Sequence, residues 1–229
     1  MCGRYSVIPK KGAKGGSRAT KLLEQYHAET RYNAAPSQLL PVVTDREPDK
    51  LQFFSWGLLP HWSKEKGYKH KSINARAETL TEKPTFRELI NHKRCLVPAD
   101  SFYEWKSTSA GKQPYRVLLR SGELFSFAGL WDEWADKETG EVVDSFTIIT
   151  TEANELMRPI HDRMPVLLHP EEEELWLSGE QANEHLLSLL RPYPSEEMKV
   201  YPVSSLVNSP THDSPEVLEP APEQGSLFG

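Results

Sequence analysis

The sequence predicts a single α+β domain, built as a twisted, largely antiparallel and barrel-like β-structure with helices at its periphery. With 229 residues, the chain has the length of a large β-rich domain and can bury a sizeable core. Short segments rich in β-branched, aromatic and leucine residues outnumber the segments with helical spacing. Neither an internal repeat nor a linker divides the chain, which favours one domain.

Eight segments have the composition of strands, and turn-forming residues separate them. They are 39–44, 51–56, 94–97, 101–105, 115–119, 124–130, 145–150 and 200–203. Four further segments have the spacing of short helices, namely 19–27, 85–91, 171–177 and 181–190. Pro170 and the glutamates after it suit the start of the third helix, because carboxylates stabilise a helix N-terminus.

Cysteine usage and apolar runs indicate the compartment. The chain has two cysteines, Cys2 and Cys95, and no charged-then-apolar leader, which argues against secretion and a disulfide framework. Cys95 lies in an apolar stretch and is predicted to be a buried structural thiol. No apolar run is long enough to span a bilayer. We therefore expect a cytoplasmic protein without a membrane partner, and nothing in the sequence suggests more than a monomer.

Charge is unevenly distributed along the chain. Residues 1–130 carry 22 Lys and Arg against 12 Asp and Glu, a balance of +10. Residues 131–229 carry 5 against 21, a balance of −16, and the two halves sum to the net charge of −6. A basic first half suits contact with a phosphate backbone, although uneven decoration of a solvated surface explains the same numbers.

The sequence gives no sign of a metal or a cofactor. The eight histidines show no paired spacing with cysteines or carboxylates that would indicate a zinc site. A glycine-rich phosphate loop is also absent from the sequence, which argues against nucleotide hydrolysis.

Cys2 follows the initiator methionine, and this position gives it unusual chemistry. If Met1 is removed, Cys2 carries a thiol and a free α-amine on adjacent carbons. An α-amine has an ordinary pKa of about 8 and a thiol of about 8.5, so both groups can supply a nucleophile near neutral pH. Such a 1,2-aminothiol can condense with an aldehyde to an imine, which the sulfur closes to a thiazolidine. It can also act as an N-terminal nucleophile.

Three further segments carry polar groups in unusual company. Residues 72–78 form a polar stretch that contains Asn74, and residues 100–105 set Glu104 among aromatic residues. Residues 159–165 place His161 between charges and prolines. Each has a structural explanation when taken singly, because Glu104 can face solvent on an alternating strand and His161 can cap a turn.

Six motifs in order resemble those of the SRAP family, the SOS-response-associated peptidase-like proteins that shield abasic sites in single-stranded DNA. The resemblance covers nearly the whole chain and implies an SRAP-like domain over residues 1–218, followed by a disordered acidic tail over 219–229. The motifs are Met-Cys-Gly-Arg (1–4), Arg-Tyr-Asn-Ala-Ala-Pro (31–36), Trp-Gly-Leu-Leu-Pro (56–60), Asn-Ala-Arg-Ala-Glu (74–78), Phe-Tyr-Glu-Trp (102–105) and His-Asp-Arg-Met-Pro (161–165).

The resemblance implies a catalytic role for four residues. Cys2, freed of Met1, would capture the ring-opened aldehyde of an abasic deoxyribose as a thiazolidine. Asn74 would lie beside the cysteine and orient the sugar or the amine. Glu104 would shuttle protons during imine formation and ring closure, and His161 would assist sugar ring opening.

The same resemblance implies a surface for single-stranded DNA, which places the protein at the nucleoid. Arg4, Arg76 and Arg163 would grip phosphates near the captured sugar. Pro36 and Trp62 would stack on or wedge against bases, and Trp62 is expected to be exposed because it lies in a lysine-rich loop. Residues at two further positions are expected to contact DNA, namely Asn33 and Thr150.

Two other protein classes share some of these features. An N-terminal-nucleophile amidohydrolase of the glutamine amidotransferase kind also begins Met-Cys-Gly, but it expects an Asn-Gly-Asp segment, and no Asn in this chain is followed by Gly. The second class is a literal peptidase, with Cys2 as nucleophile and Glu104 or His161 as base. The family resemblance implies a crosslinking, lyase-like activity, and a thiol peptidase activity is the alternative that stays open.

The last residues contain a separate motif. The segment Gln-Gly-Ser-Leu-Phe (224–228) resembles the pentapeptide that binds the bacterial sliding clamp. Gln224 would be the polar anchor, and Leu227 and Phe228 would insert into an apolar pocket. An inert solvated tail is the alternative.

A peptide spanning residues 219–229 tests this motif. We expect it to bind the sliding clamp at micromolar rather than nanomolar strength, because a short disordered segment loses entropy on docking and buries little area. Calorimetry measures this directly, with a peptide in which Leu227 and Phe228 are alanines as the control. No heat of binding at several hundred micromolar would leave the tail without this function.

Overall fold

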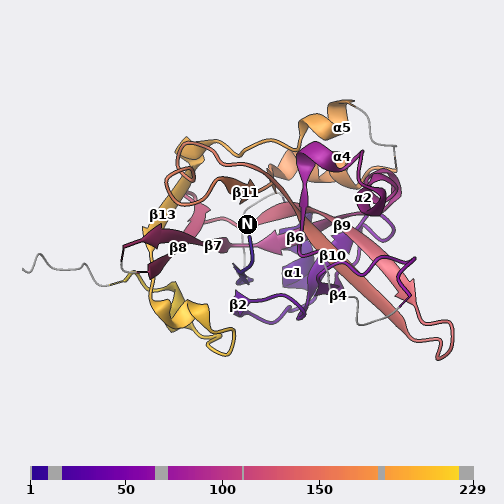
Figure 1. Cartoon of the computed structure of the whole chain (residues 1–229), viewed down its shortest axis with the longest axis horizontal. Coiled ribbons are helices and arrows are strands. Elements are labelled where there is room, and N and C mark those ends of the chain that lie inside the picture. The colour runs from indigo at the N-terminus through magenta and orange to yellow at the C-terminus, as the bar shows by residue number, and fades with distance from the viewer. Residues whose placement is uncertain (1, 10–16, 65–71, 110, 180–183, 222–229) are drawn as a thin grey trace, which may run out of the picture.

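A closed ring of five strands forms the centre of the molecule (Figure 1). The computed structural model describes residues 2–9, 17–64, 72–109, 111–179 and 184–221. Neighbours in the ring pair antiparallel except for β10 and β4, which run parallel. In order around the ring the strands are β10 (Val142–Glu152), β4 (Gln52–Trp56), β3 (Leu39–Thr44), β6 (Arg94–Ala99) and β9 (Phe125–Ala135), which pairs again with β10.

A second sheet of five antiparallel strands holds the N-terminal strand at an inner position, next to one edge. Its order is β13 (Met198–Pro202), β8 (Gly111–Leu119), β7 (Ser101–Thr108), β1 (Tyr5–Val7) and β2 (Arg31–Ala34). In Figure 1 this sheet lies beside the ring, with the yellow C-terminal segment next to β8 and β13. Because β1 has a partner on each side, its backbone groups are satisfied on both edges.

Shorter elements extend these sheets and cover the ends of the ring. Three short strands are added: β5 (Asn74–Arg76) and β11 (Arg163–Pro165) pair with β10, and β12 (Leu167–Leu168) pairs with β9. The α-helices are α1 (Arg18–Gln25), α2 (Pro84–Arg87), α3 (Leu89–His92), α4 (Glu173–Leu177) and α5 (Glu184–Ser188). Single 3₁₀ turns are η1 (Ala77–Thr79), η2 (Pro170–Glu172), η3 (Ser195–Glu197), η4 (Ser205–Asn208) and η5 (Pro215–Leu218).

The predicted largely antiparallel, barrel-like fold is confirmed, with differences in detail. The helix expected over 85–91 is two one-turn helices, α2 and α3, and α5 covers only part of the expected 181–190, whose first residues lie outside the described chain. Strands β1, β2, β5, β11 and β12 were not predicted, because they are too short to carry a period-two pattern. No helix in the described ranges is long and apolar enough to cross a membrane.

Aromatic side chains fill the interior, where β1 meets the ring. The ring of Tyr5 packs edge-on against Trp56 at 5.2 Å and against Phe127 at 5.8 Å, measured between ring centroids. Cys95 is fully buried, as predicted. A Cβ at Gly129 would lie 2.8 Å from the Cys95 sulfur and 3.0 Å from the Thr147 carbonyl oxygen, so only glycine fits at this position of β9.

A buried arginine holds two helix ends against the ring. Arg94 is fully buried, and its Nη1 donates to the carbonyl oxygens of Ile90 at 2.8 Å and Asn91 at 3.1 Å. Its Nε donates to the Trp176 carbonyl at 2.6 Å, and its Nη2 donates to the Ser178 carbonyl. These carbonyls end α3 and α4, where no helical N–H can reach them. One guanidinium therefore stabilises the packing of both helices.

Replacing Arg94 by methionine tests this packing. We expect Arg94→Met to lower the free energy of unfolding by about 3 kcal/mol or more, because several buried carbonyls lose a charged donor. Urea unfolding followed by far-ultraviolet circular dichroism measures the change. Arg87→Met is the matched control, since Arg87 is exposed on α2 and pairs only with exposed Glu88. Equal midpoints for the two variants would contradict this role.

Candidate functional site

Pairing of β1 with β7 brings Cys2 to the strand that carries Glu104. Tyr5 lies opposite Phe102 and Ser6 opposite Ser101. The Tyr103 N–H donates to the Arg4 carbonyl at 3.0 Å, so the pairing extends toward the N-terminus. Two more steps in the same antiparallel register place Gly3 opposite Glu104, and Cys2 beside it.

Asn74 fixes the backbone of Cys2. Its Nδ2 donates to the Cys2 carbonyl at 2.9 Å and to the Ile73 carbonyl at 2.7 Å. Parallel pairing of β5 with β10 holds Asn74 opposite Ile148, which sets the direction of its side chain. The Oδ1 of Asn74 is buried and has no hydrogen-bond partner within the described part of the chain, so one acceptor beside Cys2 is available for a new donor.

Burial controls the acidity of the Cys2 thiol. Cys2 is fully buried, and its Sγ lies 3.9 Å from the Arg4 carbonyl oxygen. Burial raises the pKa of the Cys2 thiol, and the negative charge of Glu104 raises it further. The thiol therefore keeps its proton at neutral pH, and any reaction at sulfur needs a base.

Glu104 and His161 line one open cavity of about 400 Å³, which we call the site cavity. Glu104 is 2% exposed, at the wall made by β7. His161 is partly exposed, and its Nδ1 accepts the Arg163 backbone N–H at 3.0 Å. The same nitrogen lies 2.8 Å from Asp162 Oδ1. Cys2, Asn74, Glu104 and His161 thus come together from four separate segments.

Arg76 and Arg163 lie on β5 and β11, the two short strands that pair with β10. Arg163 makes a two-pronged ion pair with Glu78, at 2.8 and 3.0 Å, and donates to the Thr150 carbonyl at 2.6 Å. Its Nη2 also donates to Thr150 Oγ1 at 3.3 Å. Thr150 is fully buried and contacts Arg163 rather than solvent. Arg76 is exposed and makes no hydrogen bond or ion pair within the described chain.

Arg4 and Asn33 hold the C-terminal strap, which we define as residues 203–221. Nη1 of Arg4 donates to Asn33 Oδ1 at 2.9 Å and to the Val207 carbonyl at 2.7 Å. Nδ2 of Asn33 donates to the carbonyls of Val207 at 3.2 Å, Ser209 at 3.0 Å and His212 at 2.8 Å. Asn33 is fully buried, so its side chain holds the strap and is closed to DNA in this conformation.

The strap continues the ordered chain beyond the expected domain end at 218. The Ala221 N–H donates to the Pro202 carbonyl at 2.8 Å, and Val203 bridges Pro220. The first residues of the expected tail therefore lie against β13. Gln224, Leu227 and Phe228 lie outside the described residues.

Pro36 lies at a tight turn before β3. The Gln38 N–H donates to the Ala35 carbonyl at 3.3 Å, and Ser37 has a φ of 73°. Proline followed by a positive φ is the pattern of a type II turn, whose third position usually favours glycine. The turn leaves Pro36 half-buried.

Trp62 is 50% exposed, as predicted. The residues before and after it, His61 and Ser63, are held by hydrogen bonds to the body of the protein. Asp132 is buried and accepts the His61 backbone N–H at 2.8 Å, while its Oδ2 lies 2.9 Å from the His61 ring Nδ1. On the other side, the Trp134 indole N–H donates to the Ser63 carbonyl at 2.8 Å. The indole of Trp62 is thereby presented at the surface.

Comparisons with known proteins show the family of this chain. A family model described as SOS response associated peptidase (SRAP) matches residues 1–210. The abasic site processing protein YoqW of Bacillus subtilis (strain 168) is 45% identical, over 96% of this chain and 99% of its own. The abasic site processing protein HMCES of Gallus gallus is 32% identical, over 96% of this chain and 78% of its own. The chain belongs to the SRAP family.

Solved structures show the same fold. A crystal structure of a protein from Bacteroides thetaiotaomicron has a TM-score of 0.82 and 32% identity, covering 96% of this chain and 100% of the other. A second crystal structure, of a protein from Bordetella bronchiseptica, has a TM-score of 0.74 and 25% identity, covering 89% and 100%. The site of this SRAP protein is therefore built on a fold that recurs among its relatives.

The structure adds site residues that the sequence did not indicate. Lys112 and Asn208 line the site cavity, and Trp105 lines it between them. The Trp105 indole N–H donates to Asn208 Oδ1 at 2.7 Å across 103 residues of sequence. No motif or spacing could have found this contact, because it depends on the course of the strap.

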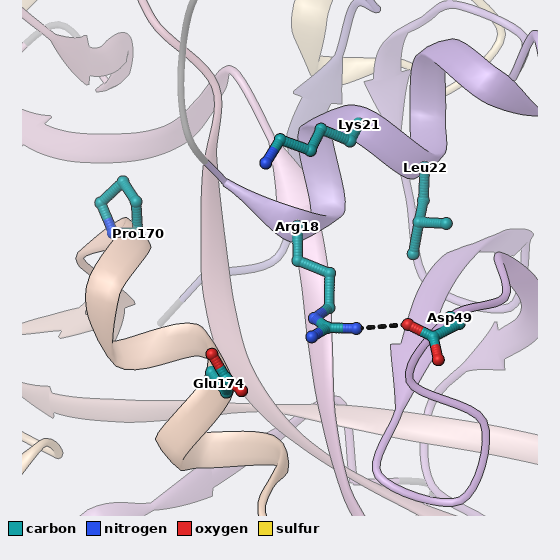
Figure 2. Close-up of a pocket in the computed structure, with 6 residues that line it drawn as sticks. All are labelled: Arg18, Lys21, Leu22, Asp49, Pro170 and Glu174. Carbon is teal, nitrogen blue, oxygen red and sulfur yellow. Dashed lines mark hydrogen bonds and ion pairs between the residues drawn. The ribbon is translucent and has the colours of Figure 1, made fainter.

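A separate hollow of about 310 Å³ lies between α1 and α4 (Figure 2). Arg18 and Asp49 line this hollow and form an ion pair of 2.5 Å. Lys21 and Glu174 also line the hollow. None of its lining residues is a predicted site residue. Within the described ranges, no group of three His, Cys, Asp or Glu is placed to hold a metal ion.

Replacing Asn33 by alanine tests the attachment of the strap. We expect Asn33→Ala to lower the free energy of unfolding by about 2 kcal/mol, because buried carbonyls and the Arg4 guanidinium lose a partner. Amide hydrogen exchange should also speed up at Val207 and Val217, which form one buried cluster with Tyr103 of β7. Asn91→Ala is the control, since Asn91 lies on α3, outside the strap, and its side chain donates to the exposed Arg87 carbonyl. Unchanged exchange across the strap would contradict the role of Asn33.

Proposed function

We propose that this protein captures abasic sites in single-stranded DNA by forming a thiazolidine between the opened sugar and Cys2. The observation that carries the proposal is the hydrogen bond of 2.9 Å from Asn74 to Cys2, beside a cavity lined by Glu104 and His161. Support comes from relatives named abasic site processing proteins, at 30–45% identity. Processing of abasic DNA lesions is the activity that these names share.

Sugar opening is the first step. An abasic deoxyribose must open its ring to expose the C1′ aldehyde, and a proton must reach the ring oxygen. The Glu104 carboxylate accepts the C1′ hydroxyl proton, and His161 in its protonated form donates from Nε2 to the ring oxygen and becomes neutral. In the neutral ring Nδ1 accepts the Arg163 N–H. After protonation the Nδ1–H faces the Asp162 carboxylate at 2.8 Å. Both charge states of His161 therefore have a partner.

Imine formation is the second step. Removal of Met1 gives Cys2 a free α-amine, whose lone pair adds to C1′ and forms a carbinolamine. Loss of water from this adduct leaves an iminium, and the departing oxygen needs a proton. Glu104 lines the cavity and interacts electrostatically with the Cys2 thiol, so it is placed to deliver that proton. Asn74 holds the Cys2 carbonyl and thereby orients the amine.

Ring closure is the third step. The sulfur of Cys2 adds to the iminium carbon, the C–S bond forms, and the thiol proton leaves. Burial raises the pKa of the Cys2 thiol, so a thiolate does not form unaided. Glu104 became ionised when it gave its proton to the oxygen that left as water. Its carboxylate now accepts the thiol proton. The reaction joins aldehyde and aminothiol with loss of one water molecule.

The surface around the cavity suits a single DNA strand. Arg76 is exposed and available for a phosphate, whereas Arg163 must exchange or share its bond to Glu78. Pro36 and the anchored Trp62 offer apolar faces on which unpaired bases can stack. An exposed tryptophan favours single-stranded DNA over an intact duplex, because only unpaired bases are free to stack on its ring.

A literal thiol peptidase is less consistent with the site. A peptidase needs a thiolate nucleophile, and the charge of Glu104 and the burial of Cys2 both oppose it. In thiazolidine formation the amine attacks first, so the thiol can stay protonated until the last step. The proposal also includes recruitment by the tail, nucleoid association and a monomeric state.

Cys2 variants test the chemistry. We expect Cys2→Ala to abolish a heat-stable adduct with abasic single-stranded DNA, and Cys2→Ser to leave at most a labile imine. Protein that retains Met1 should form no adduct, since the amine then belongs to another residue. Intact mass spectrometry reports both Met1 removal and the adduct. A stable adduct in Cys2→Ala would overturn the proposal.

Rates separate the acid–base residues from the nucleophile. Glu104→Gln and His161→Ala should slow adduct formation by about 10²–10⁴-fold with little change in DNA binding. Lys106→Ala, an exchange on the same strand, is the control. Duplex DNA with an internal abasic site and casein are the substrate controls, and neither should be converted at the rate of the single strand.

A further inference from the structure

We infer that Lys112 and Asn208 together bind the DNA phosphate next to the captured sugar. The inference rests on the proposed function and identifies a second phosphate contact, on a cavity wall to which Arg76 does not contribute. The residues come from two elements, β8 and the strap.

The need for another cation follows from how the predicted arginines are engaged. Arg4 donates to Asn33, Val207 and Asn208, and it is partly buried. Arg163 is 13% exposed and is paired with Glu78 through both terminal nitrogens. A phosphate contact by either arginine would break bonds that hold the site together. Arg76 alone of the three is free within the described residues.

Lys112 supplies a positive charge at the cavity. Among the described residues that line the site cavity, it is the one lysine or arginine. It is exposed, and it makes no hydrogen bond or ion pair to the rest of the described chain. Lys112 pairs with Ser107, so it shares its face of the sheet with Ser107 and Trp105. Lys112 and Glu104 nevertheless line the same cavity, so a phosphate next to a sugar bound at Glu104 would lie in the cavity that Lys112 lines.

Asn208 supplies oriented donors at the same place. An indole N–H can only donate, so the Trp105 bond of 2.7 Å fixes Oδ1 of Asn208 toward the indole. The amide nitrogen of Asn208 then points away from Trp105, and its two N–H groups have no acceptor within the described chain. The Asn208 carbonyl accepts from Arg4 at 3.4 Å, which ties its backbone to the N-terminal segment that bears Cys2. A lone ammonium and two aimed amide donors match a phosphate oxygen pair.

Binding to a single strand that carries a tetrahydrofuran abasic analogue tests the pair. The analogue has no aldehyde, so affinity is measured without crosslinking. Lys112→Ala should weaken binding roughly two- to five-fold at moderate salt. It should also reduce the slope of log affinity against log salt by about 0.7, the value for one phosphate contact on a single strand. Lys199→Ala is the matched control, since Lys199 is exposed on neighbouring β13 and does not line the cavity.

Asn208→Asp separates binding from structure. It keeps the oxygen that accepts from Trp105 but removes the amide donors and adds a negative charge. A purely structural role would leave binding unchanged, whereas we expect a larger loss of affinity than for Asn208→Ala. A neutral methylphosphonate can replace the phosphate on either side of the analogue, one position at a time. At one of these positions the replacement should weaken binding by the wild type but leave binding by Lys112→Ala unchanged.

Two results would overturn the inference while the wild type still binds and crosslinks. They are an unchanged salt slope in Lys112→Ala and wild-type affinity in Asn208→Asp. Loss of both binding and adduct in the wild type would instead overturn the proposed function.

Discussion

The pairing of β1 between β2 and β7 is the constraint on which the rest of the site depends. A strand of three residues contributes little surface. Because it pairs on both sides, it fixes the segment before it, so that Cys2 lies beside Glu104 and accepts a hydrogen bond from Asn74. The same strand sends Tyr5 into the aromatic interior. Because Cys2 lies three residues before Tyr5, on the segment that leads into this strand, the packing of the core also sets the position of Cys2.

Much of the site was predictable from sequence, because its chemistry resides in a few residue types within short motifs. Cys2, Asn74, Glu104 and His161 each belong to a motif, and the structure brings them together. Trp62 was predicted to be exposed from the lysine-rich loop that follows it. The antiparallel ring followed from the many short strand segments separated by turns.

The remainder depends on contacts that have no local signal. Asn33 lies in a recognisable motif, yet its amide reaches carbonyls more than 170 residues away in sequence. Lys112 resembles any exposed lysine until the strap places Asn208 across the cavity. The anchoring of Trp62 by Asp132 joins positions 71 residues apart. Periodicity and composition describe neighbours along the chain, and so they do not predict such pairs.

The position of β1 also has a consequence for how the protein is made. Removal of Met1 requires an extended terminus that an aminopeptidase can grasp, and in the folded protein Cys2 is fully buried. The partner strands of β1 begin at Arg31 and Ser101, so Cys2 takes its buried place only after the chain has been made past Ser101. Under the proposed function, the earlier part of synthesis is the time in which Met1 is most easily removed. A chain that folds with Met1 still attached would lack the free α-amine on Cys2.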